Sequence, residues 1–274
     1  MSLGIDPGSF YKSKFLSINQ LRFFFRLRCN IRPAWPVYEI NYYNMQYTGV
    51  LLVAAMGLIG RATAQQEQVR QVSGFDKIGT GGSFAVHVKI NGTESLKIDG
   101  ADVQELAKIE TKVTNGRLEI RWMKGSEPHN YNGRIDVYVT AKSLSGLSNA
   151  GSGSMDVDGV VKGGSAEVDL SGSGSITAAV DAGKLDIVIS GSGRTTLKGK
   201  ASSTHIDIAG SGRLSADGLS TDVADAQISG SGDTYITVNK TISASIVGSG
   251  SVHYSGAATI GSVSTVGSGR LRRV

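Results

Sequence analysis

The tripeptide Gly-Ser-Gly recurs seven times in the second half of this 274-residue chain. The copies begin at residues 151, 172, 191, 210, 230, 248 and 267, so successive copies are 21, 19, 19, 20, 18 and 19 residues apart. A nearly fixed period of this length is typical of repeat proteins, in which each repeat packs only against its neighbours. The tripeptide therefore constrains the fold more than any other feature of the sequence.

Apolar and polar side chains alternate on both sides of each tripeptide. Two residues before its first glycine, five repeats place only Leu or Ile: Leu170, Ile189, Ile208, Ile228 and Ile246. Apolar or small residues also recur four and six residues after that glycine, as Met155 and Val157 do in the first repeat. Alternation with period two is the pattern of a half-buried β-strand. Each repeat is thus expected to contain a strand, a Gly-Ser-Gly corner, a second strand and a second turn.

Corners that recur at a constant interval are expected to stack on one another in a β-solenoid. A meander of hairpins would also give strands and turns, but it would not require the same corner sequence each time. Glycine at a stacked corner permits a positive φ and a close approach of neighbouring backbones. The sequence therefore predicts an all-β fold, a single-stranded parallel β-helix with a repeat of about 19 residues. A β-sandwich is the alternative.

Three other interpretations of the tripeptide disagree with its surroundings. A phosphate-binding loop needs its glycines between a strand and a helix, whereas a strand pattern follows each copy here. The calcium-binding nonapeptide repeat needs an Asp two residues after Gly-x-Gly, where this chain has mostly small, polar or apolar residues. A flexible Gly/Ser linker would lack the apolar alternation between copies. We interpret the tripeptides as structural corners.

The beginning of the chain follows a different pattern. Residues 1–44 are rich in Tyr, Phe and Arg, hold the single cysteine, Cys29, and show no usable periodicity. Met45 is followed by an apolar run of twelve residues, 49–60. Twelve apolar residues are too few to cross a bilayer, which takes about twenty.

This apolar run ends at Ala62-Thr63-Ala64, and a short apolar run before Ala-x-Ala is typical of a secretory signal peptide. We therefore predict a signal peptide over 45–64, with cleavage between Ala64 and Gln65. Residues 1–44 are then an upstream extension from a mis-assigned start, or a basic leader.

The formal net charge of +5 comes from these first 64 residues. The chain has 28 basic and 23 acidic residues, of which 7 and 2 lie before residue 65, so that residues 65–274 hold 21 of each. Nucleic-acid binding requires a basic face on the folded domain, and we expect no such partner. Residues 65–274 contain no cysteine, which excludes disulfides and thiol catalysis there. Their length fits a single domain.

Residues 69–148 also contain strand patterns but lack the regular repeat. Their short alternating runs are separated by Asn91-Gly92, Asp99-Gly100 and Asn115-Gly116. Such pairs between alternating runs are the strongest hairpin signals in a sequence. A solenoid needs an atypical end to cover its core. We expect 69–148 to form this irregular capping part and 149–274 to form the regular repeats of one domain, 65–274.

Together with the tripeptides, three segments resemble the head GIN domain of putative auto-transporter adhesins, a family of secreted bacterial proteins. They are Val-Ser-Gly-Phe-Asp-Lys-Ile at 72–78, Leu-Glu-Ile at 118–120 and Val-Tyr-Val at 137–139. The resemblance covers residues 70–272. It implies a right-handed β-helix located at the cell surface or in the periplasm, and it supplies no catalytic residues.

Acidic side chains precede several corners by five or three residues. These odd offsets alternate with the apolar positions, so the side chains are expected to point outward on neighbouring coils. The candidate ligand-binding residues of this acidic column are Asp169, Asp186, Asp207 and Asp225, accompanied by Glu167 and His205. Stacked carboxylates repel one another at about 5 Å. The column therefore favours either a bound cation or sugar, or a solvated charged face.

No catalytic constellation is apparent in the sequence. The four histidines, His87, His129, His205 and His253, lack the spacing of a metal site. No serine occupies a Gly-x-Ser-x-Gly elbow. We therefore predict no catalytic residues, no metal and no cofactor.

These observations predict a non-enzymatic, adhesin-like β-solenoid that is exported to the periplasm, the outer surface or the medium. It would bind a surface glycan or an envelope protein, or serve as a structural module, with no membrane span after the signal peptide. The first alternative is a carbohydrate-active β-helix enzyme, a polysaccharide lyase or hydrolase, and the second is a periplasmic scaffold. Val263, Val266 and Leu271 near an uncapped C-terminus predict a surface for homo-oligomer formation.

Overall fold

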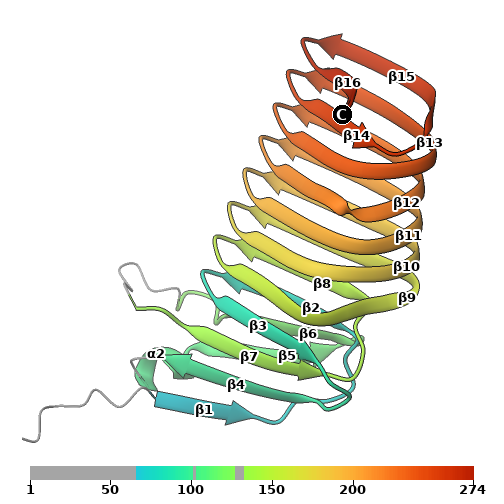
Figure 1. Ribbon diagram of the computed structural model, residues 1–274. Coiled ribbons are helices and arrows are strands. Elements are labelled where there is room, and N and C mark those ends of the chain that lie inside the picture. Colours follow the sequence, from blue (N-terminus) through green and yellow to red (C-terminus); the bar gives the residue numbers. More distant parts are fainter. Residues whose placement is uncertain (1–65, 101–102, 127–132) are drawn as a thin grey trace, which may run out of the picture. The chain divides into compact units, whose positions relative to one another are not determined.

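A computed structural model describes residues 66–100, 103–126 and 133–274, which all belong to one compact unit (Figure 1). They form a 16-stranded mixed sheet and a short helix, α2 (Val103–Ala107). The strands of the N-terminal part are β1 (Gln66–Arg70), β2 (Lys77–Gly82), β3 (Ala85–Ile90), β4 (Ser95–Gly100), β5 (Ile109–Thr114), β6 (Arg117–Trp122) and β7 (Asp136–Ala141). Those that follow are β8 (Gly146–Gly151), β9 (Ser154–Gly172), β10 (Ser175–Gly191), β11 (Arg194–Gly210), β12 (Arg213–Gly230), β13 (Asp233–Gly248), β14 (Ser251–Ser255), β15 (Thr259–Gly267) and β16 (Arg270–Arg273).

Each strand from β9 to β13 forms one complete coil, and each coil lies parallel to the next (Figure 1). In the pair β10–β11 the parallel register extends from Ser175 opposite Arg194 to Gly191 opposite Gly210. The second turn of the repeat is a bend within the strand, as at Gly199, where φ is 113°. The predicted parallel β-solenoid is confirmed. The sandwich alternative is wrong, because its sheets would be antiparallel.

The two halves of each coil share one core. All five Leu and Ile residues two positions before the corners are at most 2% exposed, and they belong to the same buried cluster as Ile176 and Leu214, which follow corners. Outward side chains therefore form two surfaces on either side of this core. We call the outward residues that follow each corner the post-corner face, and those that precede each corner the pre-corner face.

The corners stack through their backbones. At the third corner, the N–H groups of Ser192 and Gly193 donate to the carbonyl oxygen of Gly172 at 2.9 and 3.0 Å. Gly191 has a φ of 115°, and a Cβ atom there would lie 2.5 Å from that same oxygen. Only glycine meets both conditions, which explains why the tripeptide recurs.

An eighth corner, Gly82-Ser83-Phe84, lies in the part expected to be irregular. Gly82 pairs with Gly151 in register, and its carbonyl oxygen accepts a hydrogen bond from Gly153 at 3.2 Å. Strands β2 and β3 thus form a coil below β8 and β9. The sequence analysis missed this corner because Phe84 replaces the third residue of the tripeptide.

The rest of the N-terminal part mixes parallel and antiparallel pairs. Strands β6 and β7 extend the coil in parallel to β2 and β3, and β5, β4 and β1 add antiparallel edges. Asn115-Gly116, with φ values of 51° and 75°, forms the predicted hairpin between β5 and β6. A hairpin at Asn91-Gly92 was wrongly predicted, because β7 lies between β3 and β4.

The last coil has one free edge in the part of the chain that the structure describes. Strand β15 pairs only with β13, and β16 only with β14. Ile260 and Val263 continue inward columns but are 57% and 45% exposed, and Leu271 is half-buried. Val266, opposite the exposed Val247, points outward.

Candidate functional site

The pre-corner face brings the four predicted acidic residues together, although they stand in two rows. The first row, on strands β9 to β12, consists of Glu167, Asp186, His205 and Asp225. The second consists of Asp169, Val188, Asp207 and Gln227. Each of the four is half-buried or exposed. A residue without a carboxylate separates the two predicted members in each row.

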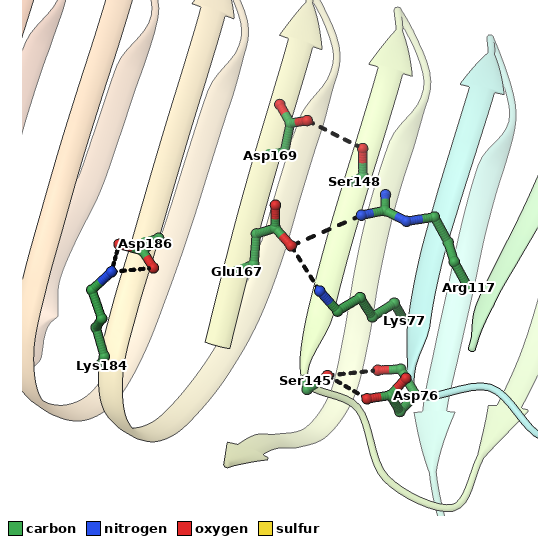
Figure 2. A network of polar contacts seen from close by, with 9 residues as sticks. All are labelled: Asp76, Lys77, Arg117, Ser145, Ser148, Glu167, Asp169, Lys184 and Asp186. Atoms are coloured by element: carbon green, nitrogen blue, oxygen red, sulfur yellow. Dashed lines mark hydrogen bonds and ion pairs between the residues drawn. The ribbon is translucent and has the colours of Figure 1, made fainter. Parts of the chain in front are cut away.

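Local cations neutralise much of this acidic surface (Figure 2). Lys77 of β2 and Arg117 of β6 both reach a carboxylate oxygen of Glu167, at 3.0 and 3.9 Å. The ammonium of Lys184 lies 2.9 Å from both oxygens of Asp186. These cations offset the repulsion that stacked carboxylates would otherwise produce.

The remaining predicted carboxylates have weaker partners. Asp225 lies 3.5 Å from Nδ1 of His205, and Asp169 accepts two long hydrogen bonds, of 3.5 Å each, from Ser148 and Ser171. Asp207 has no hydrogen bond or ion pair with any described residue. Across the described ranges, no three His, Cys, Asp or Glu residues are grouped so that they could hold a metal ion.

A second surface, which the sequence analysis did not single out, is a groove of about 590 Å³ on the post-corner face. Strands β3, β7, β9 and β10 line it, with His87, Tyr138, Asp156 and Thr177 among the outward side chains. The rings of His87 and Tyr138 stack at 5.0 Å with an interplanar angle of 23°. The ammonium of Lys97 lies 4.9 Å from the centre of the Tyr138 ring. The groove falls within the size range of small-ligand sites.

Asp136 anchors the histidine at the edge of this groove. Burial of its carboxyl group alone would raise the pKa, but hydrogen bonds from His87 at 3.1 Å and Arg134 at 2.9 Å hold the pKa of Asp136 below its ordinary value. An ionised Asp136 accepts a hydrogen bond from Nε2–H of His87 and thereby fixes the tautomer of the ring. The His87 ring is therefore oriented before any ligand arrives.

The model of the family "Putative auto-transporter adhesin, head GIN domain" matches residues 74–258. The chain belongs to this GIN-domain family. The match includes both surfaces described above, and it confirms the resemblance found in the sequence.

Solved structures share the fold of this GIN-domain chain. A putative adhesin from Bacteroides fragilis is 24% identical with a TM-score of 0.70, and the alignment covers 76% of this chain and 96% of that one. A putative adhesin from Parabacteroides merdae is 19% identical with a TM-score of 0.62, covering 78% and 98% of the two chains. A putative lipid binding protein from Parabacteroides distasonis is 23% identical with a TM-score of 0.61, covering 76% and 96%. No curated protein matches the chain.

Several residues singled out in the sequence do not come together in this GIN-domain structure. The histidines His87, His205 and His253 lie on different strands, and their neighbours differ. His129 and the predicted cleavage site, Ala64 and Gln65, lie outside the described residues. The corner serines are exposed, and their side chains form no hydrogen bond with any residue that the structure describes. No helix among the described residues is long and apolar enough to span a membrane.

The groove could not be found by sequence reasoning. Period-two alternation does place His87, Tyr138 and Asp156 on outward positions. However, the three residues lie far apart in the chain, and β7 pairs with β3 although three strands and a helix separate them in the sequence. Nothing in a local pattern signals that pairing.

Proposed function

We propose that this GIN-domain protein is an exported, adhesin-like module that binds a surface glycan or an envelope protein without transforming it. The observation that carries the proposal is the arrangement of outward side chains in straight rows on a continuous solenoid, in a chain that belongs to a family of adhesins. Rows with fixed spacing present many weak contacts at once to an extended partner. Such a surface favours binding over chemistry.

Export is part of this proposal. The apolar run at 49–60 and the Ala-x-Ala sequence before Gln65 support a signal peptide, and a family of adhesins acts outside the cytoplasm. The mature protein would then be residues 65–274, located in the periplasm, on the outer surface or in the medium.

The acidic rows of the pre-corner face are one proposed contact surface. Asp207 has no partner among the described residues, and Asp169 and Asp225 have only long contacts there, so their carboxylates are available to accept hydrogen bonds from a ligand. Asp186 is held by Lys184, and a ligand would have to share or displace that ammonium. Sugar hydroxyls are suitable donors to such carboxylates.

The test is a glycan array probed with purified residues 65–274, followed by product analysis on each hit. Binding without cleavage is the expected result. If the acidic rows make the contact, the double variant Asp186→Asn, Asp207→Asn should weaken binding about tenfold or more, because each asparagine keeps an acceptor oxygen but loses the charge that strengthens the hydrogen bond. Asp222→Asn is the matched control, because this carboxylate lies near the bend of β12, outside the acidic rows and the post-corner face, and pairs with Lys240 at 2.8 Å.

Cleaved products would overturn the proposal in favour of a carbohydrate-active enzyme. A blank array would instead direct the search to envelope proteins, by capture with the same purified chain. Sedimentation of this sample also measures the predicted homo-oligomer, which we propose to form through the free edge of β15 and β16.

A further inference from the structure

One outward row runs along the entire post-corner face and changes from large to small side chains and back. In register order it consists of Lys97, Tyr138, His87, Asp156, Thr177, Thr196, Ser215, Tyr235, His253 and Arg272. Four short side chains on β9 to β12 thus stand between two aromatic pairs. The row therefore forms a trough whose floor lies on four consecutive coils.

An aromatic ring closes each end of the trough. Tyr138 covers one face of the His87 ring, so the other face is directed along the row toward Asp156. At the far end, the rings of Tyr235 and His253 stack at 4.6 Å and 7°, which leaves the other face of Tyr235 directed toward Ser215. The free ring faces of His87 and Tyr235 are therefore directed toward each other, five strand spacings or about 24 Å apart.

The groove at the His87 end shows that this trough is hollowed where it begins. Its outward lining includes Asp156, Asp158 and Lys89, none of which has a hydrogen bond or ion pair with a described residue. Farther along, Arg194 and Lys198 flank Thr196 on β11 and are also unpaired. The trough thus offers unused hydrogen-bonding groups at both its beginning and its middle.

The charges along the trough are balanced. The unpaired acids are Asp156, Asp158 and Asp217, and they equal in number the bases Lys89, Arg194 and Lys198, none of which has a side-chain partner among the described residues. Arg213 is paired with Asp233 at 3.4 Å. A polyanion such as a nucleic acid would instead require a row of cations. Unpaired acids, bases and hydroxyls beside aromatic faces suit a ligand that has many hydroxyl groups and also apolar C–H faces.

We propose that the post-corner face binds a linear polysaccharide, laid along the solenoid axis between His87 and Tyr235. This inference rests on the proposed binding function and names both its ligand class and its site. Sugar rings at the two ends pack their C–H faces on His87 and Tyr235. The rings between them donate and accept hydrogen bonds over Asp156, Thr177, Thr196 and Ser215. The length of the trough selects a chain of several sugars over a single sugar.

The experiment measures binding of residues 65–274 to oligosaccharides of cellulose and xylan, each as a series of increasing length. Oligosaccharides of polygalacturonate form an anionic comparison series, which the balanced charges of the trough should bind more weakly. In the series that binds, affinity should rise with length and level off once the chain spans the trough. Tyr235→Ala should weaken binding of the long oligosaccharides about tenfold, the effect of a lost aromatic contact. Tyr235→Phe keeps the ring and should stay within about threefold of the original chain.

A second variant fills the floor without touching the core. Thr196→Lys places a long side chain over the middle of the trough, and we expect it to abolish the dependence on length. The matched control is Ser202→Lys, an exposed position near the bend of the same strand β11 and away from both the trough and the acidic rows, which should bind as the original chain does. Thermal melting of all variants verifies that each is folded.

The possible results separate this inference from the proposed function. If the chain binds sugars and only the Asp186→Asn, Asp207→Asn variant binds them more weakly, the trough is refuted as the binding site, while the proposed binding function stands. If no oligosaccharide binds but an envelope protein does, the inference of a polysaccharide ligand is refuted, while the proposed adhesin-like binding function stands. If neither binds, both proposals fail.

Discussion

The coils β9 to β13 and the N-terminal strands β1 to β7 share one core but follow different pairing rules. Each coil pairs with the coils before and after it in sequence. In the N-terminal part, β3 pairs with β7 and β9, and β4 lies between β1 and β7. The first rule is local and repeats in the sequence, whereas the second depends on contacts between distant segments. The regular repeat in the sequence therefore identifies only the coils β9 to β13, whereas the coiled structure already begins at β2 and β3.

Glycine-to-alanine substitutions should give the largest difference in stability between the two parts. Gly191→Ala places a Cβ atom 2.5 Å from the Gly172 carbonyl oxygen at a φ of 115°. We expect it to lower the free energy of unfolding by about 3 kcal/mol, from backbone strain and the displaced corner. At Gly92 of the N-terminal part, φ is 86° but no atom lies within 4 Å of the added Cβ. Gly92→Ala should cost about 1 kcal/mol. Urea denaturation measures both.

Equal losses at these two positions would contradict the view that stacking, and not the φ angle alone, fixes glycine at the corners. Gly164→Ala is the control, because that glycine has neither a positive φ nor a neighbour within 4 Å of its added Cβ.

Replacement of a buried threonine by valine should change the free energy of unfolding by a smaller amount, and in opposite directions in the two parts. Thr195 of the regular coils is fully buried, and its hydroxyl has no hydrogen-bond partner in the part of the chain that the structure describes. Thr195→Val should therefore raise the free energy of unfolding by about 1 kcal/mol. Thr80 of the N-terminal part donates to Asn149 Oδ1 at 3.0 Å, so Thr80→Val should lower it by about 1 kcal/mol. Thermal melting of the two variants distinguishes gain from loss, and a loss at both positions would refute the comparison.

The smallest expected effect is a dependence on pH. Among the described residues, two carboxyl groups have lowered pKa values, and both belong to the N-terminal part. Hydrogen bonding from Lys142 lowers the pKa of Glu94, and the bonds from His87 and Arg134 outweigh burial at Asp136. Because the folded pKa lies below the unfolded one, this stabilisation is present above about pH 4 and is lost as pH falls through the folded pKa.

For Asp136 this contribution should be smaller than the effects at the glycines and threonines, because burial of the carboxyl group opposes the two hydrogen bonds. Denaturation at neutral and acidic pH should show a smaller pH effect in Asp136→Asn than in the original chain. The opposing Asp99 of β4 stays paired with Lys97 at 3.0 Å in both proteins. An unchanged pH effect would assign the stabilisation to other carboxylates, such as Glu94.

The sequence was sufficient for the coils because one repeat carries all the information for its own contacts. Ile189 lies inward and Asp186 outward for the same reason, the period of two, and Gly191 identifies the corner between coils. Asn115-Gly116 likewise specified its hairpin through adjacent residues alone.

The groove and the eighth corner required the structure. The eighth corner escapes a search for Gly-Ser-Gly because Phe84 stands where the other corners have a glycine. The groove depends on the position of β7 between β3 and β4, which stacks Tyr138 on His87. The acidic column was placed on the correct face, but the cations that neutralise it come from Lys77 and Arg117, which sit on strands far away in the sequence. Partners across coils depend on register, which alternation within one strand does not reveal.

The corners stay in register from one coil to the next, and this alignment also has a consequence for how such a protein can change over generations. Each coil brings its own corner and receives its neighbours through the same backbone hydrogen bonds. Duplication of one repeat, such as residues 192–210, would therefore insert a complete layer and leave both ends as they are. The distance between His87 and Tyr235 would grow by about 4.8 Å per inserted repeat. Gain or loss of whole repeats during evolution could thus change the length of the post-corner face in steps of one coil.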